Sequence, residues 1–463
     1  MTELIRMIKR FAILFKLGVI GLLTLLLLIP LGMVDSILQE RLQRRDEAIG
    51  EITSTWGPAQ VIAGPVLVVP YENVTKRKQR VSGKSQDGWT EVSETTVAKT
   101  CFLPDELEIG GSVEPLRRKR GIYEAVLFRA NLQLSGSFNG VNPEQFKTGV
   151  EGRARWDQAY IALAVTDLRG VTDVLKIKLD DKVLTMEPGV LLGGFNSGVH
   201  ARLKETVKGA APLRFSMDLA LNGSGSLSFV PVAIRQKVRL DSTWASPGFN
   251  GAFLPTQRQI SDKGFEALWE ISYYGRKYPQ AWVDSGGQAL PFRGETVQES
   301  QFGVRFLGMI DHYRSVERAI KYGILFIVLV FLTFFLFEVI TRMRVHVFQY
   351  VLVGAALCLF YLALISVSEV LSFAPAYLIS ALVCSLMITL YSMGILRSGR
   401  RTLLLGLGML STYGFLYVIL QMEDYSLLVG TIGLFIALGC VMAATRRINW
   451  YADDGKNAET LKS

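Results

Sequence analysis

The chain has 463 residues, of which 50% are hydrophobic, and a formal net charge of +9. This length allows more than one folded unit, because a domain commonly takes about 100–200 residues. The apolar excess is concentrated in residues 11–34 and 322–444, whereas the stretch between them has the composition of a water-soluble domain. This distribution, with no nucleic-acid-binding motif beside it, excludes nucleic acid as the reason for the basic charge and indicates an integral membrane protein.

Six membrane-spanning helices are expected. The first apolar segment, residues 11–34, exceeds the roughly 20 residues that a helix needs to cross the hydrocarbon. Basic residues precede it but no small-residue cleavage site follows, so we expect an uncleaved anchor rather than a signal peptide. The five further segments are 322–340, 348–367, 372–395, 402–421 and 426–444.

The charges of the short loops predict the orientation of these helices. Loops that contain arginine alternate with loops that contain neither Lys nor Arg, and the arginines concerned are Arg342, Arg344, Arg397, Arg400, Arg401, Arg446 and Arg447. Basic loops stay in the cytoplasm, so both termini are expected there and residues 35–320 on the other side. Arg41, Arg44 and Arg45 oppose this assignment, but long translocated domains follow the charge rule poorly.

Four regions follow from these assignments. They are the cytoplasmic N-terminus with the first span (1–34), a periplasmic domain (35–320), a five-helix bundle (321–446) and a cytoplasmic tail (447–463). Residues 34–52 and 311–321 carry apolar residues at helical spacing. We expect the first stripe to extend the anchor as an amphipathic stalk and the second to run straight into the next span. The alternative is that both stripes pack on the core of the domain.

Between the two stalks the pattern changes to that of β-strands. Apolar or alternating runs bounded by Gly and Pro predict strands at residues 64–71, 123–138, 160–165, 215–221, 226–232, 267–273 and 302–309. The segment Asn222-Gly223-Ser224-Gly225 is a hairpin signal between two of these runs. The expected fold is therefore an integral membrane α-helical protein with a large, mainly antiparallel β extramembrane domain.

Motifs for catalysis, cofactors and metals are missing from the sequence. The three histidines, His200, His312 and His346, are far apart and have no metal-ligand spacing. Neither a nucleophile elbow, a P-loop nor a dinucleotide fingerprint occurs. We therefore expect no enzyme activity, no cofactor and no metal.

Two charged features remain as candidate functional residues. The run Arg117-Arg118-Lys119-Arg120 has the charge to contact anionic lipid headgroups or an acidic envelope polymer, and its alternative is a solvated loop face. Glu338 closes an apolar run, and acids inside a membrane segment are costly and often functional. Its alternative is an interfacial anchor paired with Arg342, four residues further on.

Several stretches, taken in order, resemble the CreD family of bacterial inner-membrane proteins over nearly the whole chain. They include Arg44-Arg45-Asp46-Glu47-Ala48, Gly64-Pro65-Val66-Leu67-Val68-Val69-Pro70-Tyr71, Arg120-Gly121-Ile122-Tyr123-Glu124-Ala125, Ser246-Pro247-Gly248-Phe249-Asn250-Gly251, Pro279-Gln280-Ala281-Trp282 and Leu357-Cys358-Leu359-Phe360-Tyr361. The resemblance implies an N-terminal anchor, a periplasmic domain, several C-terminal spans, a role in envelope maintenance and expression under a two-component system. It supplies no catalytic residues. One departure is Val370 after Glu369, where the family pattern has a histidine.

The leading hypothesis is an inner-membrane protein that supports envelope integrity and the stress response by binding or organising an envelope component. Its expected partners are membrane lipids and an envelope or inner-membrane protein. A transporter or lipid-handling protein is the main alternative, and it requires Glu338 to face the interior of the bundle. A wall hydrolase with acids converging in a cleft of residues 53–310, and a membrane-embedded sensor, stay open.

Overall fold

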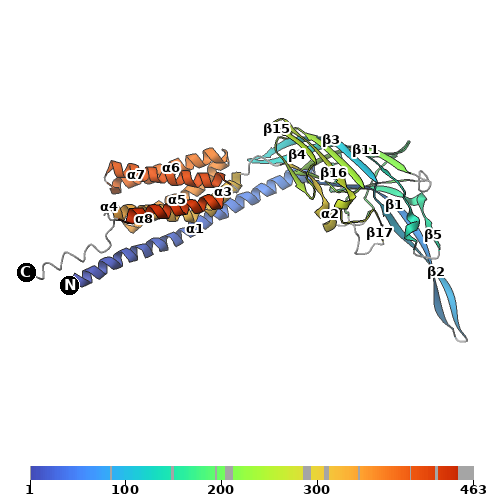
Figure 1. Cartoon of the computed structure of the whole chain (residues 1–463), viewed down its shortest axis with the longest axis horizontal. Helices are drawn as coiled ribbons and strands as arrows, with labels where there is room; N and C mark the ends of the chain where they lie inside the picture. Colours follow the sequence, from blue (N-terminus) through green and yellow to red (C-terminus); the bar gives the residue numbers. More distant parts are fainter. Residues whose placement is uncertain are drawn as a thin grey trace, which may run out of the picture. The chain divides into compact units, whose positions relative to one another are not determined.

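The computed structural model of the protein describes residues 2–83, 86–147, 151–192, 195–203, 212–284, 294–306, 312–341, 345–396, 398–422 and 426–446. The chain divides into a membrane unit, Met1–Asp46 with Ile310–Ser463, and a β unit, Glu47–Met309. Figure 1 shows the helices of the first unit and the strands of the second. The predicted tail 447–463, and Arg342 as the predicted partner of Glu338, lie outside the described residues.

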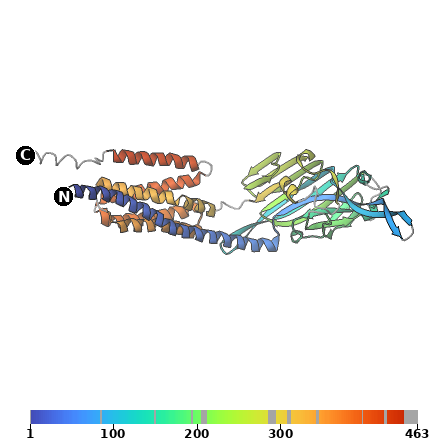
Figure 2. The same ribbon diagram turned by 90° about the horizontal axis from the view of Figure 1, so that it is seen from below.

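Long apolar helices and one short amphipathic helix, residues 312–321, build the membrane unit, and they run side by side in both views (Figures 1 and 2). They are α1 (Thr2–Trp56), α3 (His312–Lys321), α4 (Gly323–Thr341), α5 (Val347–Ser368), α6 (Phe373–Leu396), α7 (Gly399–Gln421) and α8 (Ser426–Thr445). Among the described residues, four helices are long and apolar enough to span a membrane, and the bent pair α3–α4 makes a fifth. The sixth predicted span coincides with α8, whose side chains are described only in part, so the number six stays a prediction.

Side chains of α1 pack against α4 and α5 in the core of the membrane unit. Leu27 and Leu31 of α1 belong to a buried cluster with side chains from α3, α4, α5, α6 and α7. A Cβ on Gly354 would lie 2.2 Å from Leu27 Cδ1, and one on Gly323 would lie 2.9 Å from Leu31 Cδ2. Small residues at these crossings let the helix backbones approach closely, which is how helices associate in lipid.

The predicted stalk residues pack largely within the membrane unit. The anchor does continue as one helix through residues 34–52, as predicted. Val34 and Leu38 of α1 lie in the same buried cluster as Val316 and Ile320 of α3. The prediction that 311–321 runs straight into the second span is wrong, because α3 and α4 meet at a bend of 50°. The bend turns the apolar face of α3 onto the cluster while the charged side chain of Lys321 stays exposed.

The first sheet of the β unit, sheet A, has ten strands. Seven form the path β14 (Pro247–Gly251), β18 (Phe302–Phe306), β12 (Ser226–Phe229), β1 (Gln60–Gly83), β6 (Tyr160–Val165), β10 (Gly198–Arg202) and β9 (Glu187–Pro188), and the others are β2 (Gln86–Phe102), β5 (Glu151–Ala154) and β17 (Ala281–Asp284). The pair β1–β12 is parallel and the remaining pairs are antiparallel. The hairpin of β1 and β2 extends beyond the rest of the β unit (Figure 1).

The second sheet, sheet B, has eight strands. Their order is β15 (Gln257–Ser261), β16 (Gly264–Ser272), β13 (Arg235–Ser242), β3 (Glu106–Arg120), β4 (Tyr123–Phe138), β11 (Leu213–Ser224), β7 (Lys176–Leu179) and β8 (Lys182–Thr185). Here β13–β3 is the parallel pair. The domain is therefore mixed, with antiparallel pairing predominating as predicted. A short helix, α2 (Gly294–Ser300), precedes β18.

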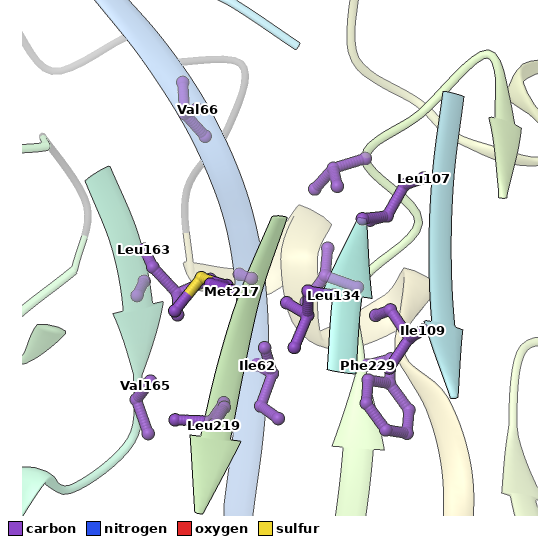
Figure 3. Packing of buried hydrophobic residues seen from close by; sticks show 14 of the residues in the cluster. Ile62, Val66, Leu107, Ile109, Leu134, Leu163, Val165, Met217, Leu219 and Phe229 are labelled. Atoms are coloured by element: carbon purple, nitrogen blue, oxygen red, sulfur yellow. The ribbon is translucent and has the colours of Figure 1, made fainter. Parts of the chain in front are cut away.

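The inner faces of the two sheets share one hydrophobic core, which Figure 3 shows from close by. Ile62 and Leu163 come from sheet A, and Ile109, Leu134 and Met217 come from sheet B. The strands alternate because successive side chains point to opposite faces. In β3, Leu107 and Ile109 are therefore buried while Glu106 and Glu108 are exposed.

The predicted hairpin at Asn222–Gly225 is wrong. The strands on either side of it are present, but β11 pairs with β4 in sheet B and β12 pairs with β1 and β18 in sheet A. The chain thus crosses from one sheet to the other at Gly225, which has a φ of +68°. Both edges of β12 are taken by β1 and β18, which leaves β12 no edge with which to pair with β11.

Candidate functional site

Glu338 lies near the end of α4, where it contacts α1 and α5. Its side chain is 10% exposed and forms an ion pair with Lys16 of α1, whose side chain is 23% exposed. The Lys16 ammonium also donates a hydrogen bond to the Val345 carbonyl at 2.8 Å. This ion pair joins residues 322 positions apart in the sequence.

Both oxygens of the Glu338 carboxylate have donors. Oε1 accepts from Lys16 and from the backbone N–H of Val345 at 3.2 Å. Oε2 accepts from the Tyr350 hydroxyl at 3.0 Å. The Tyr350 ring is buried, with Phe331 and Phe334 packed at its edge. Buried charges are tolerated when they are paired and fully hydrogen-bonded, and this carboxylate meets that condition.

A second ion pair joins α1 to α5 further along the helix. Arg41 Nε lies 3.3 Å from Glu369 Oε1, at the C-terminus of α5. Lys16 and Arg41 are separated by about 37 Å along α1 at the helical rise of 1.5 Å per residue. A bilayer has a hydrocarbon core about 30 Å thick, so the two pairs fit at its two margins. The arrangement is that of a helix fixed to its bundle at both membrane surfaces.

Sequence reasoning found Glu338 but missed Lys16. The available signal was a single lysine inside the apolar run of residues 11–34, where a charge needs a partner or an aqueous margin. Nothing local identifies that partner, because the spacing of residues within one segment carries no information about a helix that follows three hundred residues later.

The basic run lies at the end of β3, beside the turn into β4. Arg117 and Lys119 lie 3.3 and 3.6 Å from the Glu124 carboxylate. Arg120 forms an ion pair with Glu51 in the last turns of α1. The Arg117 guanidinium also lies 5.0 Å from the centre of the Trp244 ring. Three of the four predicted residues therefore have partners within the β unit.

Arg118 is the exception in this run. It is exposed, and among the described residues its side chain makes no hydrogen bond or ion pair. Exposed ion pairs of the kind made by its neighbours contribute only about 0–1 kcal/mol each. Arg117, Lys119 and Arg120 can therefore exchange their carboxylate partners for another anion at little cost.

A groove of about 710 Å³ crosses the outer face of sheet B. Its charged side chains are Glu106, Glu108, Arg214, Arg235, Lys237 and Glu270. They come from β3, β11, β13 and β16, and sequence reasoning missed them as a group. The local signal was alternation of charged with apolar residues in β3 and β13, but only the strand order brings the two strands together.

The side chains of His200 and His346 contact backbone groups, which is a structural role. His200 is buried, with Nδ1 2.5 Å from the Gly189 carbonyl oxygen. His346 caps α5, where its Nδ1 accepts a hydrogen bond from the Phe348 N–H at 3.2 Å. Within the described ranges, no three His, Cys, Asp or Glu side chains gather in a way that suits a metal ion.

Comparisons with known proteins agree with the fold. A family model described as "Inner membrane protein CreD" matches residues 12–451. "Inner membrane protein CreD" of Escherichia coli (strain K12) is 31% identical over 431 residues, which is 92% of this chain and 91% of that protein. The matched range includes both units, so the similarity is not confined to apolar helices.

Proposed function

Because the chain belongs to the CreD family of inner membrane proteins, we propose that it supports envelope integrity by binding or organising an envelope component through its β domain. The family description names a location and no reaction, and we propose a role without catalysis. In this account the helices anchor and hold the β domain, and the β domain makes the contacts with the envelope.

The observation that carries this proposal is that both carboxylate oxygens of Glu338 already have hydrogen-bond donors within the protein. A transporter that uses this carboxylate needs it to exchange protons, ions or substrate groups. Glu338 does face the interior of the membrane unit, as the transporter hypothesis requires. However, Lys16, Tyr350 and the Val345 N–H occupy its oxygens. A fully paired charge of this kind suits a fixed helix contact better than a relay.

Exposed recognition groups are instead found on the β unit. Its outer surface carries the groove of sheet B and the basic run with Arg118 free to bind. Arginine side chains suit oxyanions such as phosphate and carboxylate, because the planar guanidinium donates two parallel hydrogen bonds. We therefore include anionic lipid headgroups, reached by the basic run, and an envelope or inner-membrane protein among the proposed partners.

We also propose that both termini are cytoplasmic and that the β domain is periplasmic. The arginines that oppose this orientation are compensated by carboxylates: Arg41 with Glu369 at 3.3 Å, Arg44 with Glu40 at 2.6 Å and Arg45 with Asp46 at 3.1 Å. Long translocated domains follow the charge rule poorly whatever ion pairs they form, which supports giving more weight to the short basic loops.

The test is rescue of envelope leakage in cells that lack this chain. We expect the full-length double variant Lys16→Met with Glu338→Gln to rescue as well as the unchanged protein, once both are shown to insert equally. The same assay on a variant with Arg117, Arg118, Lys119 and Arg120 replaced by Gln should show reduced rescue. Loss of rescue in the first variant with full rescue in the second would support the transporter hypothesis.

A further inference from the structure

The groove of sheet B is built from two rows of residues that run across the strands in register. The first row is Ser272, Arg235, Glu106, Ser137 and Arg214. The second row is Glu270, Lys237, Glu108, Ser135 and Ser216. Neighbouring residues in a row lie on adjacent strands and share the outer face, because side chains alternate along each strand. The rows thus place charges and hydroxyls at regular spacing.

Each row contains one ion pair, so two of the basic and two of the acidic side chains in the groove neutralise each other. Arg235 forms an ion pair with Glu106 in the first row. Lys237 Nζ lies 3.6 Å from Glu270 Oε1 in the second row. These pairs occupy the β13 side of the groove.

Glu108 and Arg214 are left without partners. Both side chains are exposed, and within the part of the chain that the structure describes neither makes a hydrogen bond or an ion pair. They lie two strands and one row apart, on β3 and β11, with β4 between them. With strands about 4.8 Å apart and about 3.4 Å per residue, their Cα atoms are separated diagonally by about 12 Å.

The surface between these two charges is polar. Ser135 and Ser137 of β4 lie between them, one in each row. The residues lining the groove include no aromatic ring on which a sugar could stack. A carboxylate at one end, a guanidinium at the other and hydroxyls between them complement a molecule with an ammonium at one end, a carboxylate at the other and amide groups between.

We propose that this groove binds a short peptide with free amino and carboxyl termini, its ammonium at Glu108 and its carboxylate at Arg214. An extended chain covers about 3.3–3.6 Å per residue, so three to five residues span the distance. Arg214 binds the carboxylate through two parallel hydrogen bonds, and the Ser135 and Ser137 hydroxyls bond to the amides between. This inference rests on the proposed function, since it names the class of envelope component that the β domain binds.

The test uses the full chain in lipid nanodiscs and titrates tetra-alanine by calorimetry. Glu108→Gln and Arg214→Gln should each weaken binding by about tenfold or more, as expected for loss of a charge-assisted hydrogen bond. The matched control is Arg239→Gln, because Arg239 is exposed on the same face of β13 but does not line the groove. It should leave the affinity unchanged.

Blocked peptides supply the second arm. N-acetylated tetra-alanine should bind weakly, and Glu108→Gln should not lower its affinity further. Tetra-alanine with a C-terminal amide should also bind weakly, and Arg214→Gln should not lower its affinity further. Equal binding of free and blocked peptides, or no binding of tetra-alanine at millimolar concentration, would overturn the inference. Peptide binding is measured apart from envelope rescue, so failure here leaves the proposed function standing, and failure of rescue leaves this binding result standing.

Discussion

Replacing Lys16 by Met tests the role of the ion pair between Lys16 and Glu338 most sharply. The substitution keeps the length and apolar stem of the side chain but removes the ammonium that Glu338 contacts. Glu338, 10% exposed, then keeps only Tyr350 and the Val345 N–H as donors. We therefore expect Lys16→Met to destabilise the membrane unit.

The size of the effect follows from burial. Leaving one partner of a buried pair uncompensated costs about 3–5 kcal/mol. Lys16 is 23% exposed and two donors to Glu338 remain, so we expect about 2–3 kcal/mol here. Removing both charges with Lys16→Met and Glu338→Gln should cost less than about 1.5 kcal/mol, because no buried charge is left unpaired. Because Lys16→Met alone costs more than the double variant, the double-mutant cycle should give a coupling energy of at least about 0.5 kcal/mol, increased by whatever Glu338→Gln costs alone.

The assay can separate the two units. All tryptophans except Trp450 lie in the β unit, so their fluorescence reports the unfolding of that unit. Helical circular dichroism during titration with dodecyl sulfate reports mainly the membrane unit. Lys16→Met should shift only the helical transition, and the matched control Lys321→Met, which removes an exposed pair with Glu317, should shift it by less than about 1 kcal/mol. Equal effects of Lys16→Met and Lys321→Met would refute the reasoning.

Two further predictions concern packing and pH. Gly354→Ala should destabilise the membrane unit by about 1–3 kcal/mol, because its Cβ would lie 2.2 Å from Leu27 Cδ1; the same titration should show partial recovery with Leu27→Ala added and no effect of Gly414→Ala, which meets nothing within 4 Å. Burial and the nearby Glu266 raise the pKa of Asp241, so its protonated form is favoured in the folded state and stability is lost as pH rises through that raised pKa. Asp241→Asn should therefore stabilise the β unit at pH 7 by roughly 0.2–1 kcal/mol, the size of a like-charge cross-strand repulsion. The midpoint of the tryptophan-monitored melt should rise and depend less on pH. A lower midpoint for Asp241→Asn would contradict this assignment.

The elements predicted correctly are those that depend mainly on the local pattern of side chains. The alternating run at residues 123–138 and the apolar run at 160–165 became β4 and β6 with the predicted bounds. The amphipathic continuation of the anchor became the outer part of α1. In these segments the side-chain period and the flanking turn residues agree, so neighbouring structure had little to override.

Features that depend on distant partners were not predictable. The turn signal at Gly225 was real, but whether the next strand stays in the same sheet depends on its own partners, and β12 pairs with the distant strands β1 and β18. The groove requires the order β13–β3–β4–β11, which combines strands from widely separated parts of the chain. Lys16 was invisible as the partner of Glu338 for the same reason.

The central claim is that the activity resides in the anchored β domain, and truncation tests it most directly. Residues 1–310, which keep the anchor and the β unit, are supplied to cells lacking the chain, and envelope leakage is scored after equal insertion has been established. The account predicts that this form restores the envelope barrier. Failure of residues 1–310 to do so, with loss of rescue also in the full-length double variant Lys16→Met with Glu338→Gln at equal insertion, would contradict the account and place the activity in the helix bundle.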